Sequence, residues 1–217
     1  MQRDVNGGRS YHSPRRAEQA AATRTAVVSA ARELFLSEGY SGTTIAAVAA
    51  RAHVAVDTVY AAVGRKPALL REVVETSISG TDHAVPARER DYVVRIREAT
   101  GVRAKILIYA DAVAQIQGRL GPVYLALREA ASTDQDCREL WETISSRRAA
   151  NMRAFVADLR VTGELRTDLS DDEMADIVWS MNGPEHWALL VHERGWTSER
   201  FGSWLADAWT RILTVAG

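Results

Sequence analysis

The chain has 217 residues, 47% of them hydrophobic, so it can form one large or two modest domains with a real core. Its formal net charge of −1 excludes a generally basic nucleic-acid coat, but residues 1–66 carry nine Lys or Arg against five Asp or Glu, and the remainder carries eighteen against twenty-three. A basic N-terminal third on an acidic body favours DNA contact at one end of the molecule, although a chance imbalance of solvated charges gives the same count.

Cysteine content and hydropathy bear on where the protein works. The single cysteine, Cys137, permits no internal disulfide, which suits a reducing compartment, and no second cysteine could resolve an oxidised form. No apolar run approaches the roughly 20 residues that a membrane-spanning helix needs. The first residues also lack the apolar segment of a signal peptide. We therefore expect a soluble protein of the cytoplasm.

The N-terminal end is predicted to begin with a flexible basic arm, residues 1–16. These residues are polar and rich in Gly, Ser and Arg, so they cannot bury enough surface to fold alone. Arg9, Arg15 and Arg16 could reach DNA phosphates or a minor groove; the alternative is an arm that contacts nothing. From Ala17 to Ser37 we expect the first helix, ended by Gly39.

A helix-turn-helix is predicted inside the segment from Thr43 to Leu70. Its first helix shows one apolar face, because Ile45, Val48, Ala49 and Ala52 recur at positions i, i+3, i+4 and i+7. The turn covers residues 52–55, with Val54 as its buried plug. The second helix would turn Val59 and Val63 inward. It would leave outward the residues Ala55, Val56, Asp57, Thr58 and Tyr60. A helix exposed in this way can lie in a DNA major groove.

The motifs around this segment are specific when taken together. They are Val27 to Phe35, Glu38-Gly39-Tyr40, Thr43-Thr44-Ile45, Val59-Tyr60 and Lys66 to Leu70. Over about residues 20–75 they resemble the N-terminal DNA-binding domain of the TetR family of bacterial transcriptional regulators. The chain departs from the family at His53, where glycine is usual, at Asp57, where glycine or a small residue is usual, and at Val63, where an aromatic residue is common. His53 is therefore expected to adopt a left-handed conformation or to shift the turn.

Phosphate contacts are predicted at both helix starts. The resemblance places the family's phosphate-contacting tyrosine at Tyr60 and its phosphate-contacting lysine at Lys66. Lys66 precedes Pro67, a favourable first helical residue, so its ammonium and the free amides of that helix end can face the same anion. Thr43 and Thr44 could bind phosphate through hydroxyl or amide, and capping alone is the alternative.

Base reading falls to Val56, Asp57 and Thr58. Val56 or the Thr58 methyl could meet a thymine methyl group, and Asp57 could accept a hydrogen bond from a cytosine amino group. Asp57 could equally serve only to satisfy the helix N-terminus. Since no basic residue occupies the front of this helix, specificity would lean on apolar contacts, the arm and DNA shape.

The rest of the chain is predicted to be helical throughout, which makes the fold class all-α. A connecting helix completes an N-terminal unit of residues 17–79, and a linker of residues 80–86 leads to a regulatory domain of residues 87–217. Apolar residues recur at three and four rather than two positions, so no strand is expected. The predicted helices are Glu89–Thr100, Val102–Arg119, Pro122–Ser132, Gln135–Val161, Asp171–Arg194 and Ser198–Val215.

Features of the second half also resemble a C-terminal region found in one branch of the TetR family. They include Trp141, Gly163 to Arg166, Trp179, Arg194-Gly195-Trp196 and Trp204. The resemblance implies an all-helical domain with a ligand cavity, whose last two long helices pair with those of a second subunit. The last helix carries a matching apolar stripe: Phe201, Trp204, Leu205, Ala208, Trp209 and Ile212.

Candidate ligand residues come from three predicted helices. They are Tyr109, Val113, Ile116 and Gln117; then Trp141, Met152 and Phe155; then Trp179, Asn182 and Trp187. They mix apolar surface with hydrogen-bonding groups, as small-molecule sites do. Asn182-Gly183-Pro184 should kink its helix and free backbone carbonyls toward a ligand. Ordinary core packing is the alternative for each of these residues.

No catalytic or cofactor motif is recognised. His186 and His192 are six residues apart, so they lie on different helix faces and are not expected to share a metal. A nucleophile elbow, a phosphate-binding glycine loop and a Cys/His cluster are all missing from the sequence. We therefore predict no enzyme activity, no cofactor and no metal.

The sequence thus predicts a homodimeric repressor that binds a pseudo-palindromic DNA operator and is released by a small apolar or aromatic effector. One alternative is a regulator that answers to a protein partner instead. Another is a helical ligand-binding or enzymatic protein that retains a degenerate DNA-binding fold.

Overall fold

The computed structural model describes residues 14–215, and they form the predicted all-α fold. Residues 1–13 of the predicted arm lie outside the described residues, and residues 14–16 belong to the first helix, which therefore starts earlier than expected. Within 14–215 no strand occurs, and Leu165 and Thr214 form an isolated antiparallel bridge. The helices are α1 (Pro14–Ser37), α2 (Gly39–Gly42), α3 (Ile45–Arg51), α4 (Val56–Ala62), α5 (Lys66–Ser79), α6 (Asp91–Glu98), α7 (Val102–Ala130), α8 (Gln135–Arg160), α9 (Asp171–Met181), α10 (Pro184–Trp187) and α11 (Ser198–Leu213), with a 3₁₀ turn η1 (Ala87–Glu89) and a π-helical turn η2 (Ala188–Glu193).

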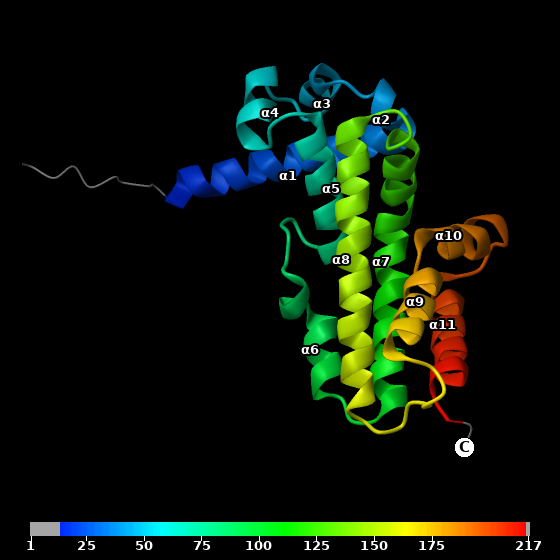
Figure 1. Cartoon of the computed structure of the whole chain (residues 1–217). Helices are drawn as coiled ribbons and strands as arrows, with labels where there is room; N and C mark the ends of the chain where they lie inside the picture. The colour runs from blue at the N-terminus through cyan, green and yellow to red at the C-terminus, as the bar shows by residue number, and fades with distance from the viewer. Residues whose placement is uncertain (1–13, 216–217) are drawn as a thin grey trace, which may run out of the picture.

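Two long antiparallel helices, α7 and α8, form the axis of the molecule (Figure 1). The connection between them is only four residues long, residues 131–134, so they must run side by side. Asp134 begins α8 by accepting a hydrogen bond from the Cys137 amide at 2.9 Å. The helices α1 to α4 sit at the end of the axis where α7 meets α8, and α6 and α11 lie nearer the other end.

The helix-turn-helix formed by α3 and α4 has the predicted geometry. The Thr44 hydroxyl caps α3 by accepting from the Ala47 amide at 3.1 Å. His53 adopts the left-handed conformation expected of it, with φ of 56°. Val54 then packs, partly buried, against the core beside Val59, which is fully buried.

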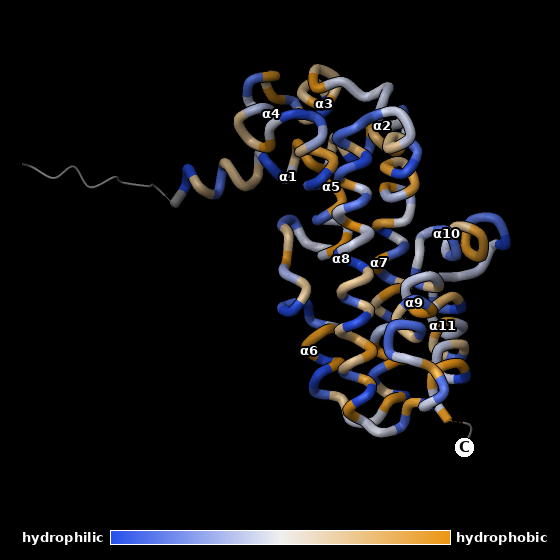
Figure 2. Tube along the Cα trace, in the orientation of Figure 1, coloured by the Kyte–Doolittle hydropathy of each residue, from blue (hydrophilic) through white to orange (hydrophobic). Residues whose placement is uncertain are grey.

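The buried side chains form two cores, which meet inside α7 and α8. The first joins α1 to α5 with the last third of α7 and the first half of α8; the second joins α6, the rest of α7 and α8, and α9 to α11. Along both long helices, hydrophobic and hydrophilic residues alternate with the helical turns (Figure 2). The DNA-binding unit is therefore packed directly onto the body, beyond its covalent link through α5.

The predicted break at Gly121-Pro122 is wrong, because α7 continues through Pro122 to Ala130. Proline inside a helix costs about 3 kcal/mol. Around it, however, α7 fully or almost fully buries Leu120, Val123 and Leu127, and such side chains contribute about 1.5–3 kcal/mol each. The burial outweighs the lost hydrogen bond, so the helix persists.

The predicted helix 171–194 is also wrong, since it is two helices and a π-helical turn rather than one kinked helix. α9 ends at Met181, and Gly183 is extended, with φ −67° and ψ 152°, as expected of a residue before proline. Pro184 then opens α10 as a favourable first residue.

Within residues 14–215, no single helix is long and apolar enough to cross a membrane. Length and composition would allow it only for α3 and α4 taken together, and that pair is bent by 98° at its turn.

Replacing His53 by glycine should stabilise the protein. The left-handed conformation costs an L residue roughly 1–2 kcal/mol, and glycine would remove this cost. Glycine also has more freedom in the unfolded chain, which reduces the gain in stability by about 0.5–1 kcal/mol. We expect His53→Gly to raise the free energy of unfolding in urea by about 0.5–1 kcal/mol. His53→Ala, which keeps the backbone cost, should bring no gain; equal stability of the two variants would contradict the assignment.

Candidate functional site

The helix α4 lies at one end of the molecule (Figure 1) and carries the predicted base-reading residues Val56, Asp57 and Thr58 together with Tyr60, the predicted phosphate contact. Val56 is 40% exposed and Tyr60 49% exposed, while Asp57 is exposed and Thr58 is half-buried. Asp57 lies in the first turn of α4, where Ala55 provides no side-chain cap, so its carboxylate also suits the positive helix end. The structure brings these four residues together and leaves both roles of Asp57 open.

The two threonines before α3 differ. Thr44 is exposed at the helix start, in reach of a phosphate. Thr43 is only 2% exposed; its hydroxyl donates to the Gly39 carbonyl at 2.8 Å, and its amide is bonded to the same turn. Both donors of Thr43 are used inside the fold, so the predicted contact of Thr43 with phosphate would require this turn to rearrange.

Lys66 and its neighbour Arg65 open α5. The Lys66 ammonium lies 4.2 Å from the centroid of the Tyr40 ring, and its burial lowers the pKa of the amine. Arg65, by contrast, is exposed at the N-cap position. Sequence reasoning passed over Arg65, although an arginine beside the predicted phosphate lysine was a usable signal.

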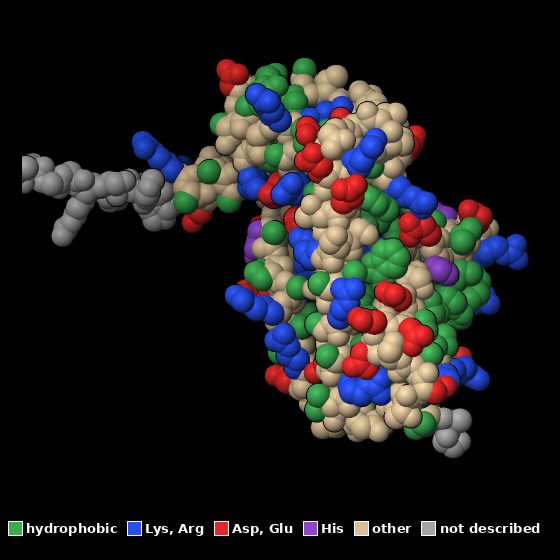
Figure 3. Space-filling model, viewed as in Figure 1, with side chains coloured by type: hydrophobic (Ala, Val, Ile, Leu, Met, Phe, Trp, Pro, Cys, Tyr) green, Lys and Arg blue, Asp and Glu red, His purple; other side chains and the backbone are tan. Residues whose placement is uncertain are grey.

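Charges around the DNA-binding end are mixed on the face that Figure 3 shows, with Lys and Arg side chains interspersed among Asp and Glu. Part of the positive charge is neutralised, since Arg51 on α3 donates to Glu33 through Nε at 2.9 Å. Contact with phosphate would therefore depend on a few unpaired groups, such as Arg65, rather than on a continuous basic surface.

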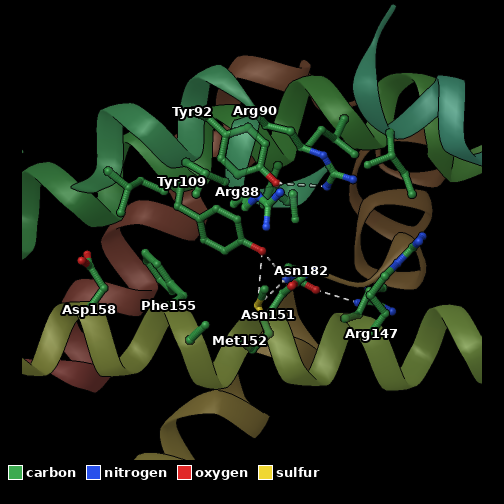
Figure 4. A pocket seen from close by; sticks show the side chains of 18 of the residues that line it. Arg88, Arg90, Tyr92, Tyr109, Arg147, Asn151, Met152, Phe155, Asp158 and Asn182 are labelled. Atoms are coloured by element: carbon green, nitrogen blue, oxygen red, sulfur yellow. Dashed lines mark hydrogen bonds between the residues drawn. The ribbon is translucent and has the colours of Figure 1, made fainter. Parts of the chain in front are cut away.

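A cavity of about 310 Å³ lies between α6, α7 and α8, with the end of α5 and Asn182 completing its wall (Figure 4). Tyr109 and Phe155 form an aromatic wall with ring centroids 4.5 Å apart, and Tyr92 stacks on Tyr109 at 6.1 Å. Seven of the ten predicted ligand residues line it: Tyr109, Val113, Ile116, Gln117, Met152, Phe155 and Asn182. Their part in ligand binding stays a prediction.

The three predicted tryptophans do not line this cavity. Trp141 lies eleven residues before Met152 on α8, about 16 Å along the helix axis, and packs on Tyr124 with centroids 4.5 Å apart. Trp179 lies under Arg148, 5.2 Å from ring centroid to guanidinium carbon. Trp187 packs on Gly121, where an added Cβ would meet its ring at 2.9 Å. All three serve helix packing.

Asn182 organises the polar floor of the cavity. It is 5% exposed, its amide nitrogen donates to the Tyr109 hydroxyl at 2.9 Å, and its side-chain oxygen accepts from Arg148 at 2.6 Å. Its backbone carbonyl, left free by the end of α9, accepts from Gln117 at 2.6 Å. The carbonyl expected to face a ligand is thus already bonded to the protein.

Gln117 supplies a hydrogen-bond acceptor that remains free. Because its amide nitrogen must face the Asn182 carbonyl, the orientation of the side-chain amide is fixed. Its Oε1 is buried and has no hydrogen-bond partner among the described residues. A buried acceptor of this kind in a cavity wall suits a hydrogen bond from a ligand or a water molecule.

Five arginines also line the cavity, and sequence reasoning missed them. They are Arg88, Arg90, Arg97, Arg147 and Arg148. Apolar periodicity treats charged residues as solvated. Arg88 lies between the predicted linker of residues 80–86 and the predicted helix 89–100, and Arg90 lies at the start of that helix. A signal existed for Arg148, which stands four residues from both Ile144 and Met152 and so shares the buried face of α8.

Metal and thiol chemistry find no support in the part of the chain that the structure describes. No group of three or more His, Cys, Asp or Glu side chains there could hold a metal ion. Cys137 is 1% exposed, and burial raises the pKa of its thiol to about 12, so the reactive thiolate is scarce at neutral pH.

Truncating Asn182 should be costly. Asn182→Ala removes the short hydrogen bond that Arg148 donates and the bond that the Tyr109 hydroxyl accepts, so we expect the free energy of unfolding to fall by about 2–3 kcal/mol. Asn151→Ala is the matched control, because Asn151 lines the same cavity outside this network, and it should change stability by less than about 0.5 kcal/mol. Equal losses in urea denaturation would show that Asn182 does not organise the floor.

Comparisons with known proteins agree with this architecture. Residues 27–73 match the sequence model described as bacterial regulatory proteins, tetR family. No curated protein sequence matches the chain. Its fold is similar to that of the MbdR regulator from Azoarcus sp. CIB, at 20% identity and a TM-score of 0.65, over 86% of this chain and 96% of that one.

Two further similar structures contain small molecules. One is the SmeT–triclosan complex, at 18% identity and a TM-score of 0.71, over 90% of this chain and 93% of the other. The other is the transcriptional regulator FadR from Bacillus subtilis in complex with stearoyl-CoA, at 15% identity and a TM-score of 0.68, over 85% and 96%. At such identities the likeness concerns the fold.

Proposed function

Because the chain belongs to the tetR family of bacterial transcriptional regulators, we propose that it binds a pseudo-palindromic operator as a homodimer. It acts as a repressor, and a small molecule with an apolar or aromatic body releases it from DNA by entering the cavity between α6, α7 and α8.

The observation that carries this proposal is the course of α5. This helix begins at Lys66, directly after the recognition helix α4, and near its other end Ile78 lines the cavity. One helix thus follows the DNA-reading element by three residues and also contributes to the ligand wall. A change in the cavity that displaces the end of α5 also displaces α4.

The thermodynamics of such control are simple. A ligand shifts the protein between conformers only by binding one of them more tightly, and couplings of about 1–3 kcal/mol are typical. The released conformer would space the two recognition helices wrongly for adjacent major grooves, which lie about 34 Å apart.

Two features support a small-molecule effector. The cavity volume of about 310 Å³ falls at the low end of the usual range for ligand sites, and its wall mixes aromatic rings with the free Gln117 acceptor. Similar regulators have been solved with triclosan and with stearoyl-CoA.

A half-exposed apolar ridge supports pairing of two chains. On α11, Phe201, Leu205 and Trp209 are fully buried against the body, whereas Trp204, Ala208 and Ile212 stay partly exposed one helical turn apart. Leu189 of η2 is 51% exposed. In Figure 3, hydrophobic side chains gather on the side of α10 and α11. A second copy would cover this ridge by two-fold symmetry.

Selection of duplexes from a random library should enrich an inverted repeat. Binding to that repeat should weaken steeply as salt rises. Tyr60→Ala should lower affinity without changing the salt slope, since tyrosine carries no charge. Replacing a cation that contacts phosphate by alanine should lower the slope of log affinity against log salt by about 1. Comparing Lys66→Ala with Arg65→Ala identifies which of the two residues makes that contact.

The control for this experiment is Arg211→Ala, which removes a positive charge on α11 that is paired with Asp207. It should bind the selected duplex like the parent chain. If no sequence is enriched, or if the α4 and α5 variants bind as the parent does, the operator-binding proposal fails.

Charging the α11 ridge should separate the subunits. We expect the parent chain to sediment at twice its 23.9 kDa mass, and Trp204→Glu to sediment as a monomer with weakened operator binding, because a carboxylate would be buried without a partner. Ser203→Glu places the same charge on the neighbouring exposed stripe and should stay dimeric. A dimeric Trp204→Glu protein would place the interface elsewhere.

A further inference from the structure

The charges that line the cavity are strongly unbalanced. Against five arginines there is one lining carboxylate, Asp158, and the Lys105 ammonium already neutralises it at 2.8 Å. Arg88 is paired with Glu89 at 3.2 Å, whereas Arg90 and Arg148 donate to carbonyl and amide oxygens rather than to carboxylates of the described residues. A cavity with this surplus of guanidinium groups attracts anions.

On the α8 wall of the cavity, opposite charges lie far apart. Asp158 ends the stretch of α8 that lines the cavity, Arg147 lies near its other end, and Phe155 and Met152 lie between them (Figure 4). Eleven residues on a helix span about 16 Å. A ligand lying along this stretch would set an apolar or aromatic body against Phe155 and Tyr109, and an acidic group near Arg147.

Arg147 is already engaged by a carboxylate of the connecting helix. Its Nη2 lies 2.7 Å from Glu75 Oε1 on α5, and the Glu75 side chain is only 17% exposed. An acidic group that enters the cavity at Arg147 therefore competes with Glu75 for the same guanidinium.

A second, separate ion pair on α5 lies next to the end of the recognition helix. One turn away on α5, Glu72 pairs with Arg24 of α1 at 2.8 Å between Oε2 and Nη2. Arg24 also donates through Nη1 to the carbonyl of Ala62, the last residue of α4. Two glutamates one turn apart on α5 therefore have different partners. Glu75 pairs with Arg147 of the cavity, and Glu72 pairs with Arg24, which contacts the end of α4.

We infer that the effector is an amphipathic anion whose acidic group displaces Glu75 from Arg147, and that this exchange of ion pairs releases α5 and shifts α4. The inference rests on the regulator proposed above and adds the charge of its effector. The ion pair between Arg147 and Glu75 forms in the DNA-binding conformer only. An anion bound to Arg147 therefore favours the released conformer. This gives the effector the difference in affinity between conformers that it needs to release the protein from DNA.

The test uses two fluorescent probes with the same aromatic body. Anilinonaphthalene sulfonate carries one negative charge, and N-phenylnaphthylamine is its uncharged counterpart. The full chain should bind the sulfonate about ten-fold more tightly or better. Arg147→Gln should remove that preference while leaving the affinity for the neutral probe within about two-fold, which also shows that the cavity is intact.

The decisive variant is Glu75→Gln, which removes the competitor. It should tighten binding of the sulfonate several-fold and leave the neutral probe unchanged. Arg153→Gln is the matched control: it removes an arginine of the same helix that pairs with Asp172 outside the cavity, and it should behave like the parent chain. Equal binding of both probes, or no gain in Glu75→Gln, would overturn the inference.

A second arm separates this inference from the proposed function. The probes are added to the complex with the selected duplex, and the sulfonate should release it at lower concentration from Glu75→Gln than from the parent chain. If a duplex is bound but the two probes act alike, the regulator stands and the anionic effector fails. If no duplex is selected, the regulator fails, whatever the charge preference of the cavity.

Discussion

The constraint on which the structure depends is the burial of the α7–α8 tip under the DNA-binding unit. Leu69, Leu70, Val73 and Val74 of α5 are fully buried in the same core as Leu120, Val123 and Leu127 of α7. Each such side chain contributes about 1.5–3 kcal/mol, whereas an exposed ion pair contributes about 0–1 kcal/mol. These seven side chains together outweigh any one ion pair, so the core fixes the architecture, and a partly buried pair such as Arg147 with Glu75 can only choose between closely related arrangements of it.

Local regularity explains why much of the fold could be predicted from the sequence. The helix-turn-helix follows from apolar spacing, the Thr44 cap and the turn at His53, all within a few residues of one another. The error at Pro122 came from the same kind of reasoning. A proline is a local signal for a break, while the burial that overrides it comes from α5 and α8, which are distant in the sequence.

The candidate site was predictable to the extent that its residues repeat along one helix. Tyr109, Val113, Ile116 and Gln117 share a face of α7 and line the cavity together. Trp141 was wrongly placed in the cavity because its helix was predicted correctly but its distance along the helix axis was not considered. Trp187 was wrongly placed there because a new helix begins at Pro184 and takes a different direction. The arginines could not be found by hydropathy, since half-burial of a charged side chain is decided by the neighbours that the fold brings to it.

The hydrogen bonds of Asn182 determine how much the floor of the cavity must rearrange when a ligand binds. Its bonds to Tyr109, Arg148 and Gln117 are made within the protein and need no bound molecule. The floor is therefore preorganised, and a ligand would lose little affinity to the conformational entropy of ordering it. Discrimination between ligands would then rest on fit to a fixed surface, whereas any rearrangement on binding falls to the wall formed by α5 and η1.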